Sequence, residues 1–381
     1  MRRGATSFRS RPPDLPPPPA LAGGGRGWLF LFQSFRPAES LKKKNHPWPL
    51  HEVVEGRSRG AKTDTAKAGG VPYIRTMASE HKDAALTANL DEAVGFTIPS
   101  RHARGRVVRL GPVLDEILSA HDYHAPIARI LSEALVMTAL LGSLLKEPAG
   151  QLTLQAQTEA GVIDLLVCDY RAGELRGYVR FDAERLTEVP SHRDLFALFG
   201  KGYLAITFDH PMADERYQGI VPLEGGSLAA AAESYFSQSE QVPSLVRLAV
   251  DDTGHIAGGI LIQHLPEGEE GRERLHTRLD HPEWEHVRAL AETIKANELS
   301  NRELPLDTLL WRLFHEEEEI RALSAVPLAK GCRCNFEYVR SVLSRFGEEE
   351  QRDMVDSDGF ISVDCEFCSR VFPISLSDLN A

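Results

Sequence analysis

The chain is poor in cysteine and has no long hydrophobic run near its start. Only five of its 381 residues are cysteine and no cleavable signal peptide is visible, so a secreted domain held together by disulfides is not expected. The apolar run at 28–32 is far shorter than the roughly twenty residues that span a bilayer. We therefore expect a cytoplasmic protein without a membrane partner, long enough to bury a core without bridges.

Signatures of catalysis are also missing. The sequence contains no Gly-rich phosphate loop, no nucleophile elbow and no pair of catalytic carboxylates that can be placed. Residues 315–319 begin like a helical metalloprotease motif but lack the second histidine, so we interpret them as a solvated acidic helix end. Residues 356–359 resemble the opening of a calcium loop without its bidentate glutamate, which favours a turn before a strand. An enzyme is therefore not predicted.

The first part of the chain differs in composition from the rest. Residues 1–76 hold fourteen Lys or Arg and five Asp or Glu, a net charge of +9, which leaves −21 for the remainder within the total of −12. A body this acidic repels phosphate backbones, so nucleic acid is not an expected partner. Proline and glycine runs without periodicity predict that residues 1–88 form a disordered extension. It could be an organelle transit peptide, but we favour translated upstream sequence, with Met77 as the true start.

Residues 89–282 are predicted to form an α/β core domain with a mixed or antiparallel sheet. Pro112 opens an amphipathic helix, and a nearly continuous apolar helix follows over 125–145. Composition and turn signals predict strands over 151–157, 162–169, 175–181, 203–209, 244–251 and 255–265, and a helix over 227–237. Cys168 falls in one of these strands, where we expect it to act as a small buried hydrophobe.

Residues 283–329 are predicted to form a helical linker. Two helices, over 282–299 and from an N-cap at Asp307, present an apolar face. This face consists of Trp284, Val287, Leu290, Ile294, Leu309, Leu310, Leu313 and Phe314. The like charges at 316–319 lie near the negative end of the second helix's dipole and weaken that helix. The two helices could be packed permanently on the core, or they could depend on docking and be released.

Four cysteines lie in the last fifty residues, as the pair Cys332 and Cys334 and the knuckle Cys365 and Cys368. Four thiolates can close a tetrahedral shell around Zn²⁺, so residues 330–381 are predicted to form a small zinc-binding domain with these four ligands. The tight Cys-x-Cys spacing also brings two thiols close enough to be oxidised to each other if the metal leaves. The cluster could therefore be a purely structural zinc module or a redox switch.

From about residue 90 onward, the chain closely resembles the heat shock protein 33 family of redox-regulated chaperones. The resemblance rests on GYVR at 177–180, GYLAIT at 202–207, YQGIVPL at 217–223, YFSQSEQ at 235–241, AGGILIQ at 257–263, LFHE at 313–316 and the spacing of the four cysteines. The extension before Met77 is a departure from the compact members of this family.

The resemblance implies an ATP-independent holdase built from an α/β core, a metastable linker and a zinc domain that covers the linker. One Zn²⁺ per chain would be bound in the reduced, inactive state. Oxidation would join Cys332 to Cys334 and Cys365 to Cys368, expel the metal and expose the apolar linker face to unfolded or partly folded client proteins. A homodimer is implied for the oxidised form. The competing hypotheses are an enzyme or interaction protein with a structural zinc module, and a zinc-ribbon nucleic-acid binder, which the acidic charge opposes.

Overall fold

In the computed structural model, the described residues are 90–379 apart from 146–148, 160, 189–194, 211–214, 224–225 and 266–280. The whole predicted extension, residues 1–88, lies outside the described residues, and so does Met77.

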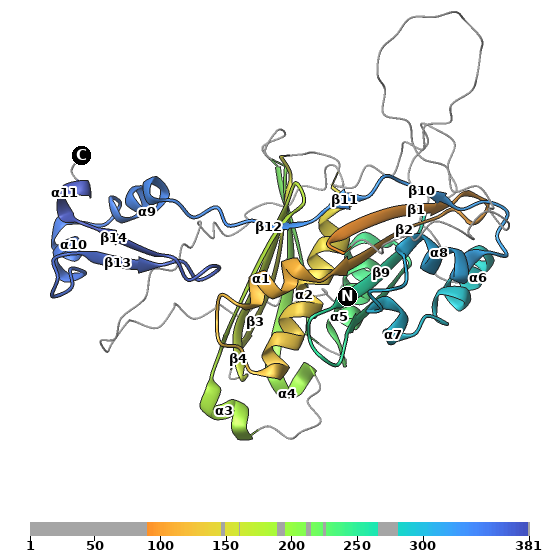
Figure 1. The fold of residues 1–381 in the computed structure, drawn as a ribbon, viewed down its shortest axis with the longest axis horizontal. Helices are drawn as coiled ribbons and strands as arrows, with labels where there is room; N and C mark the ends of the chain where they lie inside the picture. Colours follow the sequence, from red (N-terminus) through yellow and green to blue (C-terminus); the bar gives the residue numbers. More distant parts are fainter. Residues whose placement is uncertain are drawn as a thin grey trace, which may run out of the picture.

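The core contains two six-stranded sheets rather than the one sheet expected (Figure 1). In the first sheet the strands run in the order β10-β1-β2-β9-β8, with β11 also paired to β1. Their bounds are β1 Glu92–Ile98, β2 Ala103–Leu110, β8 Ser244–Val250, β9 Ala257–His264, β10 Arg321–Ala322 and β11 Val326–Pro327. The second sheet has the order β12-β5-β4-β3-β6-β7. Its strands are β3 Gln151–Glu159, β4 Ile163–Arg171, β5 Glu174–Phe181, β6 Lys201–His210, β7 Glu215–Pro222 and β12 Ala329–Lys330.

Both sheets are antiparallel along their long strands, and only β12 runs parallel to its neighbour, β5. The second sheet is therefore mixed at its β12 edge, and all strand pairs of the first sheet are antiparallel. Strand β7 was not predicted, because its apolar residues Tyr217, Ile220 and Val221 do not alternate regularly and Gly219 interrupts the pattern.

Helix α2, Ala125–Gly142, lies between the two sheets and contacts strands of both. Its apolar residues are buried nearly all round, as the sequence predicted, because both faces meet a sheet. The helix is long and apolar enough to cross a membrane by length and composition, but 72% of that stretch is buried inside the protein. We interpret it as the central helix of the core.

The other core helices are short and cover the ends and one face of the sheets. They are α1 Pro112–Leu118, α3 Ala183–Glu188, α4 Leu195–Phe199 and α5 Leu228–Tyr235, with the 3₁₀ turn η1 Pro99–Arg101 and the π-helical turn η2 Phe236–Glu240. Helix α1 begins at Pro112 as predicted, and Ser227 caps α5 by accepting a hydrogen bond from the Ala230 amide.

The linker contains three helices where two were predicted. The first predicted helix is interrupted by a turn at 292–295 and forms α6 Pro282–Ala291 and α7 Ala296–Leu299. The prediction of Asp307 as an N-cap was wrong, because α8 is Leu306–Phe314 and Pro305 is its N-cap. Asp307 instead lies in the first turn, where its carboxylate stabilises the helix by interacting with the positive end of the helix dipole. Between α8 and residue 331 the chain contains no helix, and 321–330 contributes β10, β11 and β12 to the edges of the core sheets.

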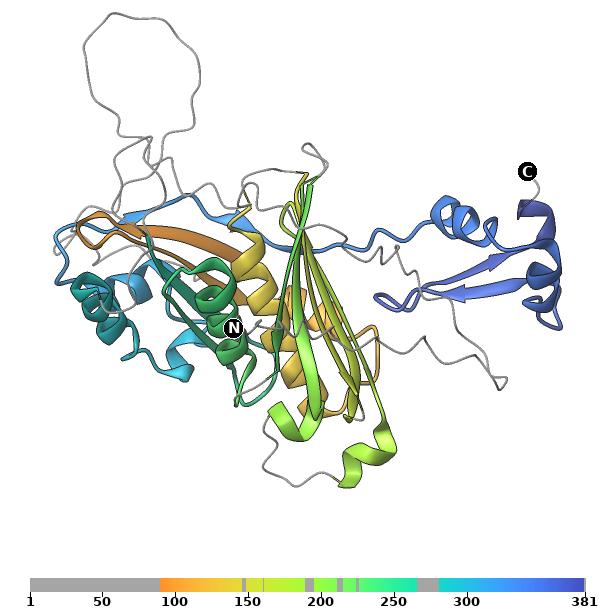
Figure 2. The same ribbon diagram turned by 180° about the vertical axis from the view of Figure 1, so that it is seen from behind.

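The C-terminal residues form a separate small module at the opposite end of the core from α6–α8 (Figures 1 and 2). It contains α9 Phe336–Leu343, α10 Glu348–Asp353, the hairpin of β13 Ile361–Asp364 and β14 Val371–Ile374, and α11 Leu376–Leu379. Five buried apolar residues form its core: Val339, Leu343, Ile361, Phe372 and Ile374. The predicted turn at 356–359 is confirmed, with Gly359 at φ +88°. A core this small stabilises little by itself.

Candidate metal centre and linker contacts

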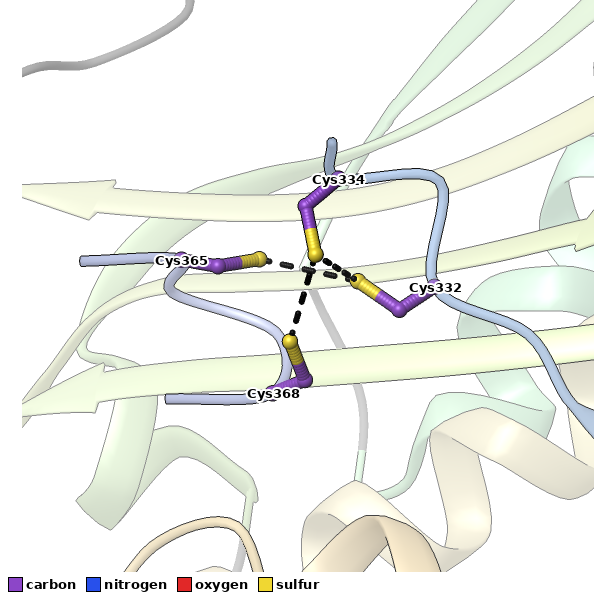
Figure 3. A group of neighbouring side chains, drawn as sticks. All are labelled: Cys332, Cys334, Cys365 and Cys368. Carbon is purple, nitrogen blue, oxygen red and sulfur yellow. Dashed lines mark hydrogen bonds between the residues drawn. The ribbon is translucent and has the colours of Figure 1, made fainter. Parts of the chain in front are cut away.

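The four C-terminal cysteines converge on one point (Figure 3). The sulfur of Cys332 lies 3.2 Å from that of Cys334 and 3.6 Å from that of Cys365, and the sulfurs of Cys334 and Cys368 are 3.4 Å apart. All four ligand atoms lie within 4.8 Å of one another, and all four cysteines are free thiols. The four cysteines that the sequence predicted to act together therefore form one cluster in the structure.

The size of this cluster suits a tetrahedral thiolate site. With Zn–S bonds of about 2.3 Å, ideal tetrahedral geometry separates the sulfur atoms by about 3.8 Å. The three short separations, 3.2 to 3.6 Å, are slightly below that value and far above the length of a disulfide bond. Four sulfur donors can therefore hold a single soft or borderline divalent cation without rearranging the backbone.

Local backbone structure presents each pair of thiols. Cys365 directly follows β13, and its carbonyl accepts hydrogen bonds from the amides of Cys368 (3.2 Å) and Ser369 (2.8 Å). Ser369 has φ +55°, the left-handed conformation that turns the chain back into β14. On the other side, the amide of Gly331 donates to the carbonyl of Leu175 (2.8 Å), so β12 brings Cys332 close to the start of β5.

The thiols perturb one another because they are crowded and partly buried. The hydrogen bond from Cys365 lowers the pKa of the Cys332 thiol to about 4, although burial acts against it. Burial raises the pKa of Cys334 to about 12, and the hydrogen bond to Cys332 raises that of Cys365. Cys332 is thus the preferred thiolate among these three. A divalent cation at the centre would favour the thiolate form of the others as well.

The cysteine knuckle contacts the core directly. The Nε2 atom of His121, in the loop between α1 and α2, lies 2.7 Å from the carbonyl of Glu366, and the hydroxyl of Ser369 donates to the carbonyl of Ala120 at 2.5 Å. On β5, the guanidinium of Arg176 lies 4.0 Å from the centre of the Phe367 ring. Sequence reasoning missed these core residues, because nothing local marks them as partners of the knuckle.

Arg333, between the first two cysteines, also points to the core. Its guanidinium donates to the side-chain oxygen of Gln151 at the start of β3, and burial lowers its pKa. Together with the knuckle contacts, this hydrogen bond places the cysteine module on the second sheet and the α1–α2 loop. The expectation that the zinc domain covers the linker was therefore wrong, since α6–α8 lie at the other end of the core in both views.

The predicted apolar linker face packs against the first sheet. Six of its eight residues are buried: Trp284, Val287, Leu309, Leu310, Leu313 and Phe314. The other two, Leu290 and Ile294, are half-buried against the same cluster. The sheet contributes residues such as Phe96, whose ring lies 5.8 Å from that of Phe314. The structure therefore brings the whole predicted set together in a docked arrangement.

Charged groups also tie the linker to the core, which corrects the interpretation of 315–319 as a solvated helix end. Helix α8 ends at Phe314, and the side chain of Glu317 is only 2% exposed. Its carboxylate accepts hydrogen bonds from Nε of Arg101 (2.8 Å), on η1, and from Nε2 of His286 (2.7 Å), on α6. Arg101 pairs in addition with Glu283. One glutamate of this acidic run is therefore buried and has specific partners on η1 and α6.

Cys168 is distinct from the metal cluster. It is fully buried in β4, and burial raises the pKa of its thiol, so it behaves as the small hydrophobe expected. Within the described part of the chain, the four C-terminal cysteines are the one group of His, Cys, Asp and Glu side chains arranged to hold a metal ion.

The fold and this site describe a two-sheet protein with a docked helical linker and a separate four-thiol module. The sequence profile of the Hsp33 family, described as "Hsp33 protein", matches residues 91–375. The 33 kDa chaperonin of Caulobacter vibrioides is 43% identical over 299 residues, covering 76% of this chain and 96% of that protein. The 33 kDa chaperonin of Shigella boydii is 34% identical over 278 residues, covering 72% and 89%.

A solved structure shows the same likeness. The crystal structure of the 33 kDa chaperonin of Thermotoga maritima superimposes with a TM-score of 0.62 at 25% identity, covering 76% of this chain and 97% of that one. The chain belongs to the Hsp33 family. It is therefore a chaperone of the heat shock protein class, and its relatives carry the name of a chaperone and not of an enzyme.

Proposed function

We propose that the protein is a redox-regulated, ATP-independent holdase that binds unfolding proteins under oxidative stress. The observation that carries this proposal is the convergence of four free thiols, all within 4.8 Å, in a small module set against a chaperone core. Cys332, Cys334, Cys365 and Cys368 would hold one Zn²⁺ per chain in the reduced, inactive state. When bound, the ion would cross-link the two halves of a module whose own apolar core is small.

Oxidation is the proposed activating event. Each disulfide forms when two thiols lose two electrons and two protons, which one molecule of hydrogen peroxide accepts to give two molecules of water. With the metal bound, all four sulfurs would be thiolates, and the Cys365–Cys368 pair could oxidise while Cys332 and Cys334 still hold a weakened site. The pairing Cys332–Cys334 and Cys365–Cys368 is taken from the family. Distance alone does not select it, because the sulfur atoms of Cys334 and Cys368 are only 3.4 Å apart.

The linker is the proposed client-binding element. Its apolar face, from Trp284 to Phe314, is covered in the docked arrangement and would become available to unfolded or partly folded clients after release. We assign 89–282 to the core domain, 283–329 to the metastable linker and 330–381 to the redox module. Cytoplasmic location and a homodimer in the oxidised state are part of the same proposal. Neither nucleic acid nor membrane is a proposed partner.

The alternative is a chaperone whose cysteine module is purely structural. The structure offers a reason to consider it, because the module docks on the second sheet and not on the linker helices. In that case the metal would stabilise the module and oxidation would only damage it. Metal content and chaperone activity, measured on the same samples, separate the two functions.

The metal assignment is tested with Cys365→Ser, using Cys168→Ser as the matched control. We expect about one zinc per chain in the parent and in the control, and strongly weakened binding in Cys365→Ser, because three thiolates no longer close the shell. Metal analysis of the reduced proteins gives the answer. Equally tight, stoichiometric zinc in Cys365→Ser would refute the ligand set.

The switch is tested by oxidising the zinc-loaded protein with peroxide at mildly destabilising temperature. We expect zinc release, two short-range disulfides and suppression of client aggregation to appear together, and thiol reductant with zinc to reverse all three. Mass spectrometry after blocking free thiols maps the bonds. Full chaperone activity with zinc still bound, or a dominant Cys332–Cys368 bond, would require the structural-metal alternative.

A further inference from the structure

One turn of the linker contacts the first sheet through the linker's own backbone carbonyls. Arg109 on β2 and Gly258 on β9 are directly opposite each other in the sheet. The side chain of Arg109 is fully buried, and its guanidinium donates three hydrogen bonds to linker carbonyls. Nε donates to Leu299 (2.9 Å), one terminal nitrogen to Glu298 (3.1 Å) and the other to Leu304.

Gly258 provides the space for this approach. A Cβ atom at this position would lie 2.2 Å from the carbonyl oxygen of Leu299, far inside van der Waals contact. No side chain fits at 258 while the linker is docked. Gly258 on β9 leaves room for a peptide carbonyl, and the guanidinium of Arg109 on the neighbouring strand β2 donates hydrogen bonds to it, so the two residues form a single site.

The site recognises main chain and not side chains. Each acceptor of Arg109 is a backbone carbonyl, and two of them, at 298 and 299, lie at the C-terminal end of α7. Burial lowers the pKa of Arg109 to about 10, with Glu92 acting in the opposite direction, so the group stays charged at neutral pH. A buried cation whose partners are withdrawn is costly, which makes the three hydrogen bonds a strong restraint.

This restraint is separate from the metal centre. Arg109 and Gly258 belong to the first sheet, whereas the cysteine module contacts β3, β5 and the α1–α2 loop. Loss of the metal therefore does not break these hydrogen bonds directly, and linker release must break them in a separate step.

We propose that Arg109 and Gly258 form a main-chain-binding site that holds the linker turn at 298–304, and that this site sets the threshold for linker release independently of the metal. The proposal rests on the proposed function, because it concerns the release step of the same switch. Arg109 is a positioning residue in it.

The test is hydrogen–deuterium exchange in the reduced, zinc-loaded full-length protein, without oxidant or client. Arg109→Met removes the donors, and Gly258→Ala displaces the Leu299 carbonyl by an independent route. In both variants we expect the amides of Leu299, Ser300, Asn301 and Leu304 to exchange about 10- to 100-fold faster, the effect of leaving buried polar groups unpaired. Zinc content should equal that of the parent.

Arg106→Met is the matched control. It makes the same chemical change on the same strand, but Arg106 donates to the carbonyls of Ser143 and Gly105 within the core. Its linker amides should exchange as in the parent. If Arg109→Met does not fold, Gly258→Ala and Arg109→Lys carry the test, because a lysine cannot span three carbonyls with a fork of donors.

Unchanged linker exchange in folded Arg109→Met or Gly258→Ala protein would overturn the proposal. Faster exchange with a lower temperature or oxidant threshold for holdase activity would support both the site and the switch. Faster exchange with no change in that threshold would support the claim that Arg109 and Gly258 hold the linker turn. It would overturn the claim that this site sets the threshold, and it would count against linker release as the activating step.

Discussion

Loosening the linker should activate the chaperone without oxidation, and Leu310→Ala is the sharpest way to test this. Leu310 is fully buried in α8 within the cluster that joins the linker to the first sheet. Truncating such a leucine costs about 3 kcal/mol, the middle of the range for buried leucines. The whole cost falls on the docked form, because the released form exposes this side chain to water in either case.

The population effect follows directly. A cost of about 3 kcal/mol raises the ratio of released to docked linker by about 100-fold. A protein whose linker is released about once in a thousand molecules would then have a released fraction near one tenth. Reduced, zinc-loaded Leu310→Ala should therefore suppress aggregation of a denatured client measurably, where the reduced parent does not.

The assay needs a control for helix stability. Arg312→Ala changes a side chain of the same helix that is 54% exposed, and it should shift stability by less than about 0.5 kcal/mol. Hydrogen exchange over 296–314 reports release, and metal analysis reports whether the module stays loaded. Leu310→Ala protein that releases its linker, keeps its zinc and remains as inactive as the parent would refute the linker as the client-binding element.

Three further predictions follow from the structure. Glu317→Gln keeps one acceptor oxygen but removes the negative charge between Arg101 and His286. We expect it to destabilise the docked linker by about 2 kcal/mol and to speed hydrogen exchange in α6. Unchanged exchange in α6 would contradict this prediction. Removing the metal from reduced protein with a chelator should unfold residues 332–379 while α2 and both sheets stay protected, and NMR or exchange data showing an intact β13–β14 hairpin would disprove it. The hydrogen bond to Asp115 raises the pKa of the exposed His255 above its ordinary value of 6.5. The pair therefore stabilises the fold below pH 6.5, and this stabilisation is lost as the pH rises through the raised pKa. The unfolding midpoints of the parent and of His255→Gln should therefore converge at high pH.

Local patterns predicted the parts of the fold that local patterns control. Helix α2 has apolar residues nearly all round, and Pro112 marks the start of α1, so both could be placed from sequence. The spacing of four cysteines predicted their convergence, because few other arrangements use two close pairs of thiols. In contrast, the division of the core strands into two sheets depends on pairings such as β2 with β9, which no local signal encodes.

The contacts that control the linker were invisible for the same reason. Glu317 lies in a run of four glutamates, and the partners of its buried carboxylate, Arg101 and His286, come from distant segments. Arg109 and Gly258 look ordinary until the register of β2 and β9 places them opposite each other. The family resemblance also implied that the cysteine module covers the linker. The knuckle instead contacts the second sheet.

In the proposed switch, the segment between the linker and the cysteine module would couple these two distant sites. Cys332 follows β12 almost directly, and β12 is held by hydrogen bonds from the Ala329 amide to Gly173 (3.0 Å) and from the Gly331 amide to Leu175 (2.8 Å). Loss of the metal removes the anchor at one end of this segment. To reach Glu317 and α8, fraying must then break β12 from β5 and both β11 and β10 from β1. Each pairing is only two residues long and so is weak, but all three must break, so we expect mild heating in addition to oxidation to be needed for full release.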